Sequence, residues 1–164
     1  MNLDPAVEAN KVLENFWENR GFPVDPVTIA KSLGVQVFDT VLPEKVSGAL
    51  IKEAGKDPVI ALHATDHDNR KRFTCSHELG HYVSRVESNR LDTQYGYIDY
   101  RGEAAAKGTD PEEVFANQFA ANLLMPEKAI RTKRRKYSSY IQLAQYFGVS
   151  VEALKHRLNT LGIL

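Results

Sequence analysis

Residues 77–81 read His-Glu-Leu-Gly-His, and they lie in a segment from about residue 66 to 86 whose apolar pattern predicts a helix. Residues four apart share one face of a helix, so His77 and His81 can bind one metal ion together. Imidazole nitrogens are good zinc ligands. Glu78 lies to the side of the same face, where its carboxylate can take a proton from water beside the metal. The stretch therefore predicts the zinc site of a metallopeptidase.

The motif also has a simpler explanation, since it can occur by chance and two histidines can lie on an exposed helix face. Its surroundings favour the metal site. Leu79 and Val83 belong to an apolar stripe that anchors the helix in a core. Gly80 costs about 1 kcal/mol of helix stability relative to alanine, which is understandable if another element must approach closely. We therefore expect His77 and His81 to bind metal.

A catalytic zinc ion needs a third protein ligand, and Glu87 is one candidate. It lies six positions after His81, where metallopeptidases of the HExxHxxGxxH class have their third ligand. Those enzymes carry a glycine at the position that Ser84 occupies here. In a continuous helix Glu87 points away from the metal, so the sequence gives this residue little support.

A stronger candidate is Glu113, in a helix predicted from about residue 110 to 125. Its helix face carries Ala116 and Ala120, whose small side chains allow close packing against the metal-binding helix. Asn117, one turn further on, can hold a liganding histidine in orientation. The pattern favours Glu113 as the third ligand.

Two alternatives to this assignment stay open. Glu113 has capping-box spacing from Asp110, so its carboxylate can serve the helix start alone. Glu112 can bind the metal instead, although its helix face carries Phe115 and Phe119, which have the character of core residues. The residues by themselves leave both alternatives in competition with the third-ligand role.

Further from the motif, the chain reads as one α+β domain spanning residues 1–164, mostly helical with a small three-stranded sheet. Residues 88–108 look irregular and contain a cluster of three tyrosines, which either line the cleft or pack in the core. A helix-turn-helix-like pair is expected at about 137–164. The other expected elements are helices at 4–20 and 26–33, strands near 35–37, 49–51 and 59–62, and a hairpin turn at 54–57.

Composition restricts the class of protein. The chain has 164 residues, 43% of them hydrophobic, and its 21 basic residues balance 21 acidic ones, which argues mildly against non-specific nucleic-acid binding. The single cysteine, Cys75, cannot form an internal disulfide. We find no signal peptide and no apolar run of the roughly 18–20 residues that cross a bilayer, so the expected setting is the cytoplasm, without membrane association. The sequence predicts no particular oligomeric state.

Two segments resemble the ImmA/IrrE-type metallopeptidases. RFTCSHELGH at 72–81 is similar to the family's RFTxAHELGH, and EVFANQFAANLLMP at 113–126 is similar to its ExxANxFAAxLLMP. Residues 29–34 and 143–150 also fit, so the likeness covers almost the whole chain. The departures are modest, with Cys75 and Ser76 in place of the usual aliphatic residue and alanine.

The resemblance implies a zincin-like, more narrowly gluzincin-like, domain. It implies a Zn²⁺ ion bound by His77, His81 and Glu113, with Glu78 as the general base. It further implies that the substrate is a protein, namely a helix-turn-helix repressor or an antitoxin-like regulator, in stress responses or mobile elements. Neither the residues nor the resemblance identifies the group that stabilises the oxyanion.

A regulator that binds DNA, with a structural or vestigial zinc site, is the alternative function. A basic run at 128–136 holds six Lys and Arg residues, and the C-terminal helix pair has the outline of a helix-turn-helix. Such runs are more often solvated helix faces, and such pairs often serve only packing. Direct nucleic-acid binding is therefore not favoured over cleavage of a protein.

Overall fold

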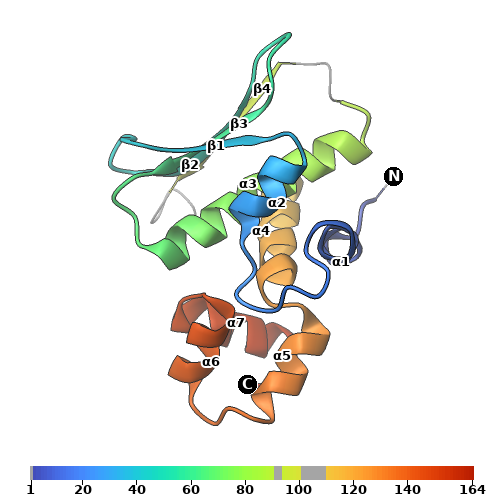
Figure 1. Ribbon diagram of the computed structural model, residues 1–164, viewed down its shortest axis with the longest axis vertical. Coiled ribbons are helices and arrows are strands. Elements are labelled where there is room, and N and C mark those ends of the chain that lie inside the picture. The colour runs from blue at the N-terminus through green and yellow to red at the C-terminus, as the bar shows by residue number, and fades with distance from the viewer. Residues whose placement is uncertain (1, 91–93, 101–109) are drawn as a thin grey trace.

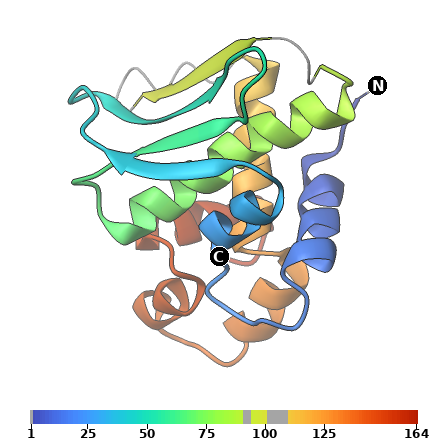
Figure 2. The same ribbon diagram turned by 45° about the horizontal axis from the view of Figure 1, so that its top comes forward.

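The computed structural model describes residues 2–90, 94–100 and 110–164 (Figures 1 and 2). It is a mixed α and β structure, as predicted, with helices in most of the expected places. In the described residues the helices are α1 (Pro5–Phe16), α2 (Pro26–Ser32), α3 (Asp68–Glu87), α4 (Pro111–Leu124), α5 (Glu127–Arg134), α6 (Tyr140–Phe147) and α7 (Val151–Thr160). The strands are β1 (Gln36–Thr40), β2 (Val46–Lys52), β3 (Val59–His63) and β4 (Tyr95–Tyr100).

The sheet has four strands in the order β1-β3-β2-β4, so the prediction of a three-stranded sheet was wrong. β1 pairs parallel with β3, and the other neighbours are antiparallel. The additional strand, β4, comes from the stretch that was predicted to be irregular. Within that stretch, 91–93 and 101–108 lie outside the described residues.

The reason for this error is visible in the burial of β4. A half-buried strand usually turns apolar residues inward and polar residues outward. In β4 the side chain of Ile98 is 51% exposed, whereas that of Asp99 is only 13% exposed. The usual alternation is thus inverted at these two positions, and the second half of the strand does not show the pattern that a sequence search looks for.

Helix α3 lies under the sheet, and α4 crosses it on the side away from the strands (Figures 1 and 2). All eight residues from Thr74 to His81 are buried. The crossing is close because Gly80 has no side chain: a Cβ atom there would lie 2.9 Å from the Cα of Ala116 and 3.2 Å from the Cβ of Phe119. The expectation that Gly80 admits a closely packed element is confirmed, and that element is α4.

The C-terminal helices α5, α6 and α7 lie together at the end of the molecule opposite the sheet (Figure 1). As predicted, a tight turn joins α6 to α7, with Gly148 in the left-handed conformation at φ +65°. The turn is itself attached to α3, because Arg72 donates a hydrogen bond to the carbonyl of Gly148 at 3.0 Å and Asn69 donates to that of Val149 at 3.3 Å. These hydrogen bonds attach the turn of the helix pair to α3, while the pair's likeness to a DNA-binding helix-turn-helix stays a prediction.

None of the helices in the described part of the chain is both long and apolar enough to cross a bilayer.

Candidate metal centre

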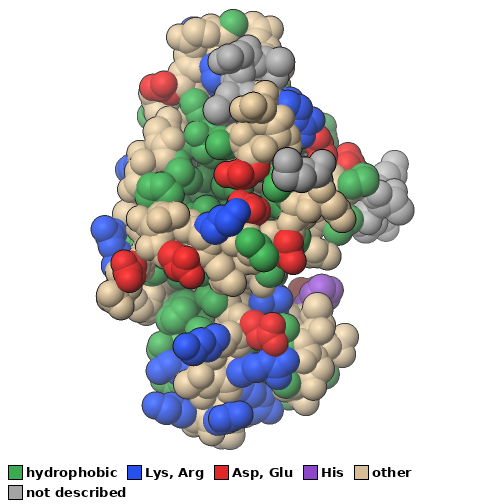
Figure 3. All heavy atoms as spheres, turned by 90° about the vertical axis from the view of Figure 1, so that its right-hand side faces the viewer, with side chains coloured by type: hydrophobic (Ala, Val, Ile, Leu, Met, Phe, Trp, Pro, Cys, Tyr) green, Lys and Arg blue, Asp and Glu red, His purple; other side chains and the backbone are tan. Residues whose placement is uncertain are grey.

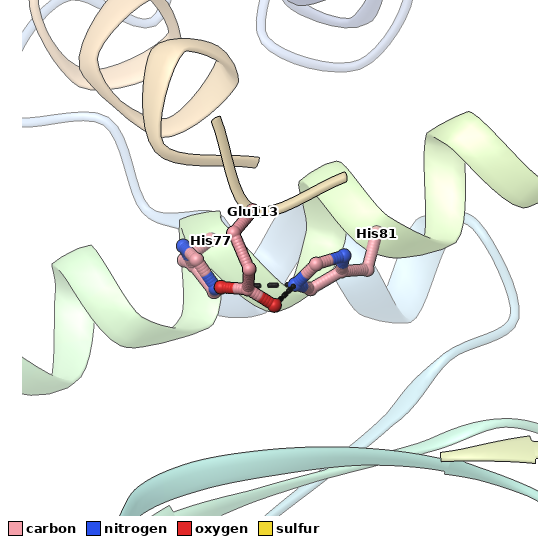
Figure 4. Close-up of side chains that lie close together, drawn as sticks. All are labelled: His77, His81 and Glu113. Carbon is pink, nitrogen blue, oxygen red and sulfur yellow. Dashed lines mark hydrogen bonds and ion pairs between the residues drawn. The ribbon is translucent and has the colours of Figure 1, made fainter. Parts of the chain in front are cut away.

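Three side chains from two helices converge between the helices and the sheet (Figure 4). α3 supplies His77 and His81, one turn apart, and the first turn of α4 supplies Glu113. The Nε2 atoms of the two imidazoles lie 3.2 Å from each other. The Glu113 carboxylate faces both rings, with Oε2 at 3.2 Å from His77 Nε2 and Oε1 at 3.1 Å from His81 Nε2.

This spacing fits a zinc ion. Bonds of about 2.0–2.1 Å in a tetrahedral arrangement place the ligand atoms roughly 3.4 Å apart. The three separations between the donor atoms, 3.1–3.2 Å, are slightly below that value. The set of two imidazoles and one carboxylate is also one that catalytic zinc sites use. Small outward movements of the side chains are therefore sufficient to accommodate the ion.

The structure separates the two roles that compete for Glu113. The side chain of Asp110 accepts a hydrogen bond from the backbone N–H of Glu112 at 2.9 Å and so caps α4. The carboxylate of Glu113 interacts with the histidines instead. Hydrogen bonds with His77 and His81 hold the pKa of Glu113 well below its ordinary value. Burial also lowers the pKa of His81, more than Glu113 raises it, which favours the neutral imidazole that a metal requires.

The rival ligand, Glu112, takes no part in this cluster. Its Oε2 accepts a hydrogen bond from the Tyr97 hydroxyl at 2.8 Å, and its Oε1 accepts two from the Arg90 guanidinium at 3.2 Å each. Burial by itself would raise the pKa of Glu112, but these hydrogen bonds outweigh it and hold the pKa below its ordinary value. Glu112 thus remains ionised as an anchor for the sheet edge.

Glu78 is fully buried beside the cluster, and neither of its carboxylate oxygens has a hydrogen-bond partner among the described residues. Burial raises its pKa well above the ordinary value, and the nearby carboxylates of Asp99 and Glu113 raise it further. An unpartnered buried carboxylate is costly unless it has a function. Both its position and its basicity suit a group that accepts a proton from water.

Asn117 holds His77 in orientation, which is the role that the sequence predicted for it. The side-chain oxygen of Asn117 lies 2.9 Å from His77 Nδ1, which leaves Nε2 directed at the other two ligands. Asn117 can reach His77 because it lies one turn after Glu113, on the same side of α4.

Sequence reasoning allowed the tyrosine cluster to line the cleft, but it missed the strand β4 and the place of Asp99 in it. Tyr97 stacks on the ring of His81, with ring centroids 3.9 Å apart and planes inclined by 10°. Two residues further along, the side chain of Asp99 is only 13% exposed and lies 3.9 Å from the Nη2 atom of Arg70. Burial raises the pKa of Asp99, against the opposing effect of the histidines and Arg70. The spacing Tyr-x-Asp was the available signal, because residues two apart in a strand face the same side.

The remaining candidates lie away from the centre. Glu87 is the last residue of α3 and its side chain is exposed, so it does not join the ligand cluster. Cys75 is fully buried, and burial raises the pKa of its thiol, which makes it an unreactive core residue.

Comparison with known proteins places these residues in context. The sequence profile of the IrrE N-terminal-like domain, a peptidase domain, matches residues 30–159. The match includes the HELGH helix, β4 and the start of α4. The chain is also similar to the "Uncharacterized immunity region protein 2" of Bacillus phage phi105, with 24% identity over 128 residues, which are 78% of this chain and 75% of that protein.

Proposed function

Because the chain belongs to the IrrE N-terminal-like family of peptidases, we propose that it is a zinc-dependent endopeptidase. Its ligands are His77, His81 and Glu113, and its general base is Glu78. The observation that carries the proposal is the position of Glu78, a fully buried carboxylate without a partner in the described residues, next to three convergent metal-ligand side chains. A purely structural metal site has no use for such a group.

The chemistry divides between the metal and the chain. A bound zinc ion would polarise the scissile carbonyl and make water a stronger acid. Glu78 takes the proton of the attacking water and then passes it to the leaving amine, and its raised pKa suits both transfers. Glu113 holds the negative charge that the two neutral histidines lack. Asn117 keeps His77 in the orientation that directs Nε2 toward the cluster.

The proposed substrate is a protein, namely a helix-turn-helix repressor or an antitoxin-like regulator, cleaved in the cytoplasm. Two observations support this choice. The phage phi105 relative is named as an immunity region protein, which fits a role in regulation. A cavity of about 1730 Å³ lies beside α4 and has space for a segment of polypeptide. None of the three ligands lines it, but Asn117 does, and the side-chain oxygen of Asn117 lies 2.9 Å from His77 Nδ1.

The proposal is tested with a purified helix-turn-helix repressor from the same host as the candidate substrate. We expect the parent protein to bind one zinc ion and cleave the repressor, and Glu78→Gln to keep the zinc and lose most of the activity, roughly 10²–10⁴-fold. Metal analysis and electrophoresis of the repressor measure both properties. Cleavage by Glu78→Gln at the parent rate would refute the mechanism.

The competing function predicts a different outcome. If the chain is a DNA-binding regulator, salt-sensitive binding to a specific DNA sequence should survive His77→Ala. We do not adopt this function, since the turn between α6 and α7 is attached to Asn69 and Arg72 of α3, and Glu152 places a negative charge in the first turn of α7. Binding curves at two salt concentrations distinguish the two functions.

A further inference from the structure

The two histidines of the centre are held in different ways. His77 Nδ1 lies 2.9 Å from the amide oxygen of Asn117, so a hydrogen bond sets the orientation of its ring. The Nδ1 atom of His81 makes no hydrogen bond with the described residues, and its ring instead lies flat against Tyr97. A liganding histidine without a hydrogen-bonded second nitrogen needs another constraint, because an imidazole that rotates loses its metal.

The Tyr97 ring is itself held in place by two hydrogen bonds of its hydroxyl. Arg85 Nε donates a hydrogen bond to the hydroxyl oxygen at 2.8 Å, and the hydroxyl donates to Glu112 Oε2 at 2.8 Å. Glu112 in turn accepts two hydrogen bonds from Arg90. The chain of contacts joins α3, β4 and α4, which are the three elements that surround the metal ligands.

We propose that Tyr97 is the positioning residue for His81. Its stacked ring keeps the His81 imidazole in orientation, as the hydrogen bond with Asn117 keeps that of His77. The inference rests on the proposed function, because it requires His81 to be a metal ligand. The Tyr97 hydroxyl, committed to Glu112 and Arg85, is not available to stabilise an oxyanion. The benzene ring of Tyr97, rather than its hydroxyl, is therefore the part that the site needs.

Zinc affinity and the spectrum of the cobalt-substituted protein test this role without a substrate. We expect Tyr97→Ile, which suits a strand but has no ring, to bind zinc roughly 10–100-fold more weakly in competition with a chelator, as for loss of other residues that support a ligand. Its cobalt absorption bands should shift, because the geometry around the ion relaxes. Tyr97→Phe keeps the ring and should retain the parent spectrum, with affinity within about fivefold of the parent.

Tyr95→Ile is the matched control. Tyr95 faces the same side of β4 and is buried, but its ring contacts Tyr97 and Arg85 rather than His81. We expect this variant to unfold at a lower temperature while keeping the zinc affinity and the cobalt spectrum of the parent. If Tyr97→Ile does not fold, Tyr97→Leu replaces it as a second variant without a ring.

Two results would overturn the inference while leaving the peptidase proposal intact. One is a ring-free variant at residue 97 that binds zinc as tightly as the parent with an unchanged cobalt spectrum. The other is an equal loss of affinity in Tyr95→Ile, which would reduce the effect to general damage of β4. A parent protein that binds no zinc would refute both proposals together.

Discussion

The α3–α4 pair and the α6–α7 pair both depend on a glycine, but they bury different chemistry. Gly80 lets α4 cross α3 closely, and that crossing buries His77, Glu78 and His81. Gly148 turns the chain between α6 and α7, where most of the buried side chains are apolar, Phe147 and Leu154 among them. The exception is Arg157, which donates hydrogen bonds to the carbonyl of Met125 and the side chain of Asn122. Burial of ionisable groups reduces stability unless a partner or a metal compensates. Burial in the α3–α4 pair thus lowers the free energy of unfolding and raises the pKa of Glu78, whereas apolar burial in the α6–α7 pair raises the free energy of unfolding.

The same division appears in the surface charge. Residues 127–164 carry eight Lys and Arg against two Asp and Glu, whereas residues 1–126 carry 13 and 19. Figure 3 shows the basic side chains gathered on the lower part of the molecule, where α5–α7 lie. A net charge of zero therefore conceals a basic C-terminal part and an acidic remainder that contains the candidate metal centre. The overall charge balance was a poor guide to either part.

Leu154→Ala should have the largest effect of the substitutions that test this comparison. Leu154 is fully buried in α7, and removing such a side chain costs about 2–5 kcal/mol of unfolding free energy. Zinc affinity should stay within threefold of the parent, because α7 supplies no ligand. Urea unfolding and chelator competition measure the two properties, with Ile141→Ala, 61% exposed, as control. A large loss of zinc affinity would show that the helical end also supports the metal site.

Gly80→Ala should have an intermediate effect and should affect both properties. The new methyl group would overlap backbone atoms of Ala116, so α3 and α4 must separate. We expect a cost of about 1–3 kcal/mol, even though alanine is the better helix former, together with weaker zinc binding as Glu113 moves away. Gly96→Ala is the control, since its Cβ atom would meet only the carbonyl oxygen of Leu50 at 3.8 Å. Equal stability of the two variants would contradict the close crossing.

Glu78→Gln should have the smallest effect on stability, and one that depends on pH. The pKa of Glu78 is raised in the folded state, so the unfolded chain loses this proton more readily and stability falls as pH rises above about 4.5. In metal-free protein at pH 8 we expect Glu78→Gln to be more stable than the parent by about 1–2 kcal/mol. The gain should vanish at pH 4.5 and below.

Urea unfolding at the two pH values, in the presence of a chelator, measures this difference. The exposed Glu44→Gln is the control, and it should leave stability almost unchanged at either pH. A gain for Glu78→Gln that is the same at pH 8 and pH 4.5 would mean that the buried charge is not its cause.

The local part of this centre was predictable from sequence because a helix repeats every 3.6 residues. That period places His77 and His81 on one face and marks the small-residue face of Glu113. Glu112 shows the limit of such reasoning: it was an equally acidic neighbour, and only its hydrogen bonds with Tyr97 and Arg90 reveal what it does. A helix pattern gives the direction of a side chain but not the element that it meets.

By itself, the sequence determined the helix that carries His77 and His81, the four-residue spacing of these histidines and the glycine that admits a neighbouring helix. All three depend on residues that lie close together in the chain. The tertiary structure alone decided that β4 covers the centre, with Tyr97 on His81 and Asp99 beside Arg70. β4 pairs with β2 across more than 40 residues of chain, from Ile51 to Gly96. No local period records such a pairing, and its inverted burial hid the strand as well.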